Sequence, residues 1–229
     1  MDSTDGTKAE NAVLMKGWSV FSAAAKTLLP GLFKRPDPIV DRESLQRFMD
    51  SRAAFMSQKG IVEFCRVRAG IYWQKLFAEE DFRQVLSHSC WQAYAPALAL
   101  VSQMVEAALR EAAGVARPRM AQAVEAVAHA AYLSYPTPAG FTAEEWADRF
   151  GLVRARMAEI VGEPARPVRK MPEGMAELIF TALPIHPSIV KNDSDYIFNN
   201  VRMNLLRAHD DFLAAADLPR LVESLLDDR

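Results

Sequence analysis

The run DFRQVLSHSCWQAYAPALALVSQMVEAALREAA, residues 81–113, decides the fold class. Alanine, leucine and other good helix formers dominate it, and no glycine interrupts it. Its apolar residues recur at the spacing that places side chains on one face of a helix. They are Phe82, Val85, Leu86, Ala93, Ala97, Leu100, Val101, Met104 and Ala108. The run therefore predicts one long helix, and Pro96 is expected to bend it or divide it in two.

The rest of the chain has the same character. Half of the 229 residues are hydrophobic, glycine is scarce at 10, and β-branched residues rarely alternate as a strand requires. Thr142 and Glu145 form a capping box that opens a helix over about 142–161, and Asp217 caps a last short helix. A buried face after Asp41 is indicated by Ile61, Phe64, Cys65, Ile71, Tyr72 and Leu76. We predict an all-α fold, a multi-helix bundle.

The composition divides the chain into four parts. Residues 1–10 are polar and acidic and are expected to form a disordered tail. Residues 11–35 are expected to form a basic amphipathic helix, which a proline–glycine pair ends. Prolines bracket a linker over residues 36–40. Residues 41–229 are predicted to be a single helical domain, because their number is that of one hydrophobic core.

The composition also excludes several functional classes. The 27 basic and 29 acidic residues give a net charge of −2, so no overall positive field attracts nucleic acid. Cys65 and Cys90 stand far apart and form neither a disulfide framework nor a metal knuckle. The polar amino terminus lacks the features of a secretory signal, and no apolar run is long enough to cross a bilayer. We expect a cytoplasmic protein without a cofactor or metal.

The amphipathic segment carries the clearest indication of function. Four apolar residues share one helix face: Leu14, Trp18, Phe21 and Leu28. The basic residues of the segment are Lys16, Lys26, Lys34 and Arg35, and it contains no acidic residue. Such a helix suits a partner's groove or the headgroup region of an anionic membrane. We predict a non-catalytic interaction or adaptor protein that docks to a protein partner or to the inner face of the membrane. Packing of this helix on its own bundle is the alternative.

Arginines at apolar positions indicate a second function. Helical spacing turns Arg52, Arg68 and Arg202 toward the apolar side of their helices. A buried guanidinium needs a carboxylate partner, which can be internal or can belong to a ligand. The alternative prediction is therefore a helical protein that binds a small acidic or apolar ligand in its interior.

Three groups contain residue types that catalysis uses: His88 with Cys90, Glu125 with His129, and His209 with Asp210 and Asp211. Residues 87–96 lack the glycine-rich turn and the orienting acid that Ser–His catalysis requires. Glu125 and His129 are half of a bundle metal site, without matching residues on other helices. Enzymatic activity is therefore not expected.

Two aromatic residues favour an oligomer of this chain. Trp91 and Tyr94 are interpreted as exposed side chains of the helix over residues 81–113. Exposed aromatic residues commonly mark contact surfaces, so a homo-oligomer is one interpretation, and the alternative is that either side chain covers a neighbouring helix.

Two segments resemble known proteins. The run FMDSRAAFMSQKGIVEFCRVRAGIYWQKLFAEEDF, residues 48–82, and VRMNLL, residues 201–206, look like parts of small helical proteins from alphaproteobacteria. The resemblance implies a bacterial, cytoplasmic protein. It brings no activity, ligand or site residue with it.

Overall fold

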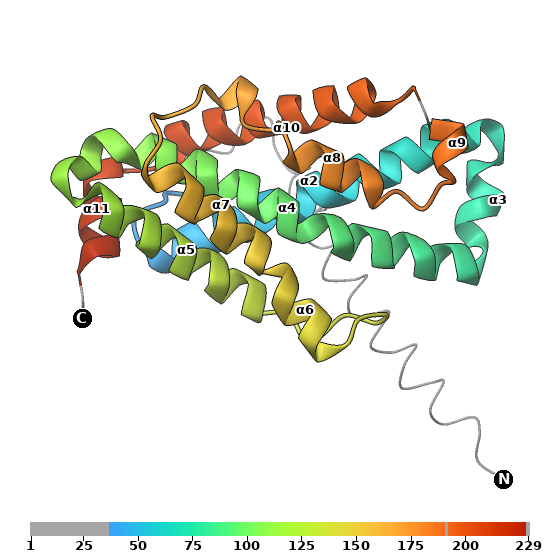
Figure 1. Ribbon diagram of the computed structural model, residues 1–229, viewed down its shortest axis with the longest axis horizontal. Helices are drawn as coiled ribbons and strands as arrows, with labels where there is room; N and C mark the ends of the chain where they lie inside the picture. The colour runs from blue at the N-terminus through green and yellow to red at the C-terminus, as the bar shows by residue number, and fades with distance from the viewer. Residues whose placement is uncertain (1–36, 191, 228–229) are drawn as a thin grey trace, which may run out of the picture.

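The computed structural model describes residues 37–190 and 192–227, which form an all-α bundle of helices (Figure 1). The predicted fold class is confirmed, and the only β pairing among the described residues is an isolated bridge. The α-helices are α2 (Arg42–Ala69), α3 (Trp73–Ala78), α4 (Glu80–Ala113), α5 (Arg117–Leu133), α6 (Ala143–Arg149), α7 (Gly151–Val161), α8 (Met175–Thr181), α9 (Pro187–Val190), α10 (Ser194–Ala215) and α11 (Leu218–Leu226). Short 3-10 helices are η1 (Gly70–Tyr72), η2 (Gly114–Ala116) and η3 (Val168–Lys170).

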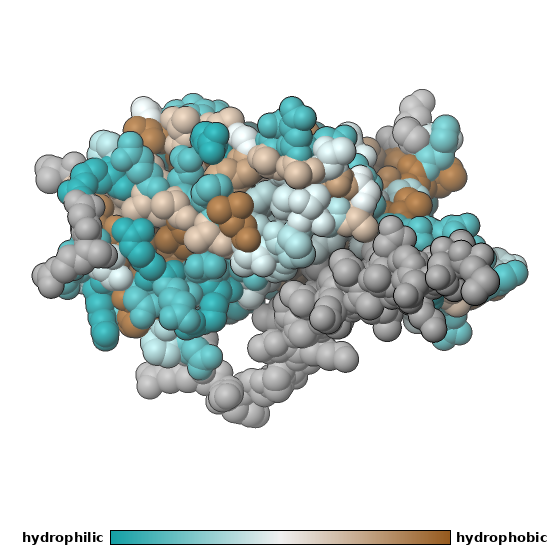
Figure 2. Space-filling view, turned by 90° about the horizontal axis from the view of Figure 1, so that it is seen from below, coloured by the Kyte–Doolittle hydropathy of each residue, from teal (hydrophilic) through white to brown (hydrophobic). Residues whose placement is uncertain are grey.

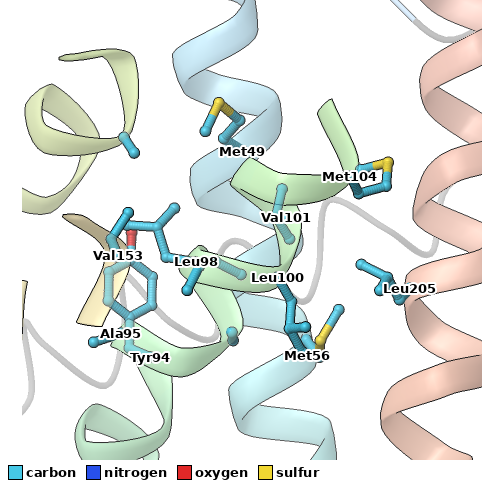
Figure 3. Close-up of a cluster of buried hydrophobic side chains, with 14 of the residues drawn as sticks. Met49, Met56, Tyr94, Ala95, Leu98, Leu100, Val101, Met104, Val153 and Leu205 are labelled. Atoms are coloured by element: carbon cyan, nitrogen blue, oxygen red, sulfur yellow. The ribbon is translucent and has the colours of Figure 1, made fainter. Parts of the chain in front are cut away.

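Helix α4 is the centre of the bundle. It packs against α2, α5, α7, α8 and α10, and every residue from 93 to 106 is buried. A helix that is buried all round needs apolar side chains on most of its faces, and the run Ala93–Val105 supplies them at every position except Ser102 and Gln103. Figure 3 shows Leu98 and Val101 of α4 between residues of α2 and of other helices. The predicted long helix is therefore confirmed, and the structure shows that it is the core element.

Pro96 neither ends nor divides α4, which continues to Ala113. Proline lacks the N–H that would bond to the carbonyl four residues earlier, so the carbonyl oxygen of Gln92 loses its usual donor. The guanidinium of Arg149 donates to this oxygen at 3.4 Å. The structure thus supplies a long hydrogen bond where the helix cannot, which explains how a proline is tolerated there.

The first described residues are fixed to the end of α10. The N–H of Ile39 donates to the carbonyl of Ala215 at 3.0 Å, and its carbonyl accepts from the N–H of Asp217 at 3.1 Å. These bonds form the parallel bridge between Ile39 and Ala216, and the Ile39 side chain is buried. Ile39, which we expected within a linker, is therefore part of the packed bundle.

Two expectations about aromatic and apolar side chains were wrong. Trp91 and Tyr94 are buried, because α4 is covered on all sides and not on one face. Ile71 and Tyr72, predicted in a buried stripe, are 87% and 70% exposed. Gly70 ends α2 with a φ of 55°, so the helical period of α2 does not continue into η1. The exposure of Trp91 and Tyr94, on which we based the expectation of a homo-oligomer, is therefore absent.

The predicted amphipathic helix over residues 11–35 lies outside the described residues. Its candidate docking residues, Leu14, Lys16, Trp18, Phe21, Lys26, Leu28, Lys34 and Arg35, lie there too. Within residues 37–190 and 192–227, no helix has the length and hydropathy that crossing a bilayer would require.

Candidate functional site

A pocket between α2 and α10 is the candidate site. Its cavity volume is about 160 Å³. The lining residues are Arg52, Phe55, Met56, Asn204, Arg207, Ala208 and Asp211. Their spacing of three and four positions on each helix explains why they share one face. Each helix contributes one arginine, so two guanidinium groups lie at one pocket.

Arg52 is held on two sides. Its Nη2 lies 3.1 Å from a carboxylate oxygen of Asp211, and its guanidinium carbon lies 5.3 Å from the ring centroid of Phe48. The Arg52 side chain is only 20% exposed, whereas that of Asp211 is 48% exposed. The buried Nε of Arg52 has no hydrogen-bond partner among the described residues. Arg52 therefore keeps one buried donor for which the described residues supply no acceptor.

The α10 wall of the pocket is polar at two further positions. Arg207 is exposed, and no carboxylate in the described part of the chain is within ion-pair distance of it. Asn204 is buried and donates to the carbonyl and side-chain oxygens of Asn200, at 2.9 and 2.8 Å. With two arginines and one aspartate, the pocket lining carries a net charge of about +1 at neutral pH.

The other two candidate arginines lie away from this pocket. Arg68 is 16 residues beyond Arg52 on α2, which is about 24 Å along the helix axis. It is paired with Asp193, at the start of α10. Arg202 lies over the ring of Phe198, with 5.9 Å from its guanidinium carbon to the centroid. The structure therefore brings none of the three predicted arginines together.

His88 and Cys90, the first group of catalytic residue types, lie on α4. Both side chains make the contacts of a packed bundle. The His88 ring stacks on Phe141 with centroids 4.3 Å apart, and its Nε2 is 2.9 Å from Nε2 of Gln92. Burial lowers the pKa of His88, and the nearby charge of Arg149 lowers it further. Burial raises the pKa of the Cys90 thiol, and it raises that of Cys65 to about 12. Both thiols are therefore protonated at neutral pH and are poor nucleophiles.

In the other two groups of catalytic residue types, each side chain contacts a different structural neighbour. Glu125 lies 3.5 Å from Arg154, and the ring of His129 packs on Phe150 with centroids 4.7 Å apart. His209 is 3.9 Å from its neighbour Asp210, while Asp211 turns to Arg52. In the part of the chain that the structure describes, no three His, Cys, Asp or Glu side chains are placed to hold a metal ion.

Sequence reasoning missed two polar clusters, one half-buried and one buried. Asp50 accepts hydrogen bonds from the hydroxyls of Tyr94, at 2.6 Å, and Tyr135, at 2.8 Å. Glu106 is fully buried and accepts two bonds from Nε of Arg110, at 2.8 and 2.6 Å. The spacing of Glu106 and Arg110, four residues apart on one helix, could have predicted the second cluster. Asp50 of α2, Tyr94 of α4 and Tyr135, just after α5, come from separate parts of the chain and leave no local pattern.

Apolar side chains are exposed at the end of the bundle where η1 and α3 connect α2 to α4. Val67 is 59% exposed, and Ile71 and Tyr72 are exposed more fully still. Figure 2 shows a group of brown residues at the same end of the molecule. This surface was not predicted, because the sequence placed two of its residues in the core.

The fold and the pocket define an all-α bundle with a small, positively charged pocket between two helices. Comparisons of the chain with family models, with curated proteins and with solved structures find no match.

Proposed function

We propose that this protein is a non-catalytic interaction or adaptor protein. It docks through residues 11–35 to the anionic surface of a membrane or to a protein partner. The observation that carries the proposal is the sequence pattern of Leu14, Trp18, Phe21 and Leu28 on one side and lysines on the other. Trp and Phe side chains contribute about 1.5–3 kcal/mol each when buried, and each basic residue adds about 1 kcal/mol near an anionic surface.

The attachment of this segment to the bundle supports the proposal. The hydrogen bonds of Ile39 fix the chain four residues after Arg35. A helix docked to a surface would therefore hold the bundle close to that surface.

The test uses point variants of the full chain. Vesicles of phosphatidylcholine, with and without phosphatidylserine, are sedimented with the wild type, with Trp18→Ala/Phe21→Ala and with the matched control Ser19→Ala/Ser22→Ala. We expect the wild type and the control to bind the anionic vesicles, and the aromatic variant to bind at least about tenfold more weakly. Binding should also weaken as salt rises.

A second arm tests a protein partner with the same three proteins, by crosslinking in the cells that produce them. Loss of one crosslinked species in the aromatic variant alone supports the proposal. If the aromatic variant equals the wild type in both arms, the proposal is wrong. A truncated chain should begin at Asp37 and not at Asp41, because the latter removes the buried Ile39.

A further inference from the structure

We infer that the pocket between α2 and α10 binds a small organic carboxylate through the guanidinium groups of Arg52 and Arg207. This binding site is separate from the docking segment of the proposed function. The cavity of about 160 Å³ is close in size to a cavity of roughly 150 Å³ that admits benzene. A ligand with one small ring or a short chain therefore fits.

The positive charge of the pocket lining favours an anionic ligand. Two guanidinium groups line the pocket against the single carboxylate of Asp211. That carboxylate is half exposed, and one of its oxygens lies 3.1 Å from Nη2 of Arg52. A planar guanidinium prefers to bind a carboxylate through two parallel hydrogen bonds. Arg52 lines the pocket, and its guanidinium keeps N–H donors beyond the Nη2 that faces Asp211.

The position of Arg52 is set before a ligand binds. Its guanidinium lies over the ring of Phe48 and contacts Asp211, so few conformations remain to be lost on binding. Arg207 is exposed on the neighbouring helix and supplies the second cation. The two arginines therefore combine one fixed donor with one that can close over the ligand.

The remaining wall selects an organic anion over an inorganic one. Phe55, Met56 and Ala208 give the pocket an apolar side, and Met56 is almost fully buried. An apolar ring or chain placed against these side chains removes apolar surface from water, which an inorganic phosphate cannot do. The ligand class is therefore a carboxylate with a compact apolar body.

Isothermal titration of the full chain with benzoate tests the inference. Benzamide, which has the same shape without the charge, and inorganic phosphate are titrated under the same conditions. We expect benzoate to bind the wild type at least tenfold more tightly than either of these two. Arg207→Gln should weaken benzoate binding at least tenfold, and this exposed residue can be replaced without disturbing the core.

Two further variants complete the design. Arg202→Gln is the matched control, because it removes an arginine from the same helix outside the pocket, and it should bind benzoate as the wild type does. Asp211→Asn removes the competing carboxylate and should bind benzoate more tightly. The inference is wrong if benzoate does not bind, if Arg207→Gln binds like the wild type, or if phosphate binds as tightly as benzoate. Trp18→Ala/Phe21→Ala should keep full benzoate binding, so a failure of the docking proposal remains distinguishable.

Discussion

Replacement of Arg110 by methionine tests how the bundle is held together. Arg110 is 9% exposed, and its Nε bonds both carboxylate oxygens of the fully buried Glu106. Its Nη atoms donate to the carbonyls of Glu163 and Ile160, both at 2.7 Å. These carbonyls lie at and just beyond the end of α7, so one side chain joins α4 to the carboxyl end of a second helix.

The expected loss follows from this burial. Methionine keeps much of the volume of arginine but leaves the Glu106 carboxylate without the guanidinium in a site that excludes water. Removal of one partner from a buried ion pair costs about 3–5 kcal/mol of unfolding free energy. The carbonyl of Glu163 also loses the donor from Arg110, which adds to this cost where water cannot replace it, whereas the carbonyl of Ile160 keeps the N–H of Glu163 at 3.3 Å.

Urea denaturation followed by circular dichroism measures the change. The control is Arg47→Met, since Arg47 and Glu43 are 66% and 82% exposed. Such a surface pair is worth about 0–1 kcal/mol. The double variant Glu106→Gln/Arg110→Met should lose less than Arg110→Met alone, because it also removes the buried negative charge that Arg110 contacts. A loss for Arg110→Met no larger than that of the control would refute the reasoning.

Two other predictions concern Asp50 and Gly140. Burial raises the pKa of Asp50 against the opposing effect of its two tyrosine hydrogen bonds, so the folded state holds the proton more tightly than the unfolded state. The unfolding free energy of the wild type, relative to that of Asp50→Asn, should therefore fall as the pH rises above about 4, and a difference that does not vary with pH would contradict this. Gly140 has a φ of 87°, and a Cβ there would lie 2.7 Å from Nδ1 of His88. Gly140→Ala should lower the thermal midpoint more than Gly174→Ala, whose φ is 83° but whose Cβ would meet nothing within 4 Å; equal losses would show that the contact with His88 is unimportant.

The elements of the fold follow from local patterns. The helix predicted over residues 81–113 is α4, Glu80–Ala113. The predicted capping box of Thr142 and Glu145 is present, with both of its hydrogen bonds formed. Spacing and capping act within a few residues, so the sequence alone can predict them.

The positions that were mispredicted depend on distant parts of the chain. The predicted buried face assumed one continuous helix. Helix α2 ends at Gly70, however, and the side chain of Ile71 turns outward. Trp91 is buried because other helices cover the side of α4 that the pattern left free. Arg207 and Asp211 reach the pocket only because α10 packs on α2, roughly 150 residues earlier in the chain. No spacing rule predicts that neighbour.

The pairing of Ile39 with Ala216 has a consequence for synthesis. The two residues are 177 positions apart, which a ribosome takes on the order of ten to thirty seconds to translate. Residues 14–28 have left the ribosome long before the strand partner of Ile39 exists. The attachment proposed for these residues would therefore be able to form while translation is still in progress, before the bundle is complete.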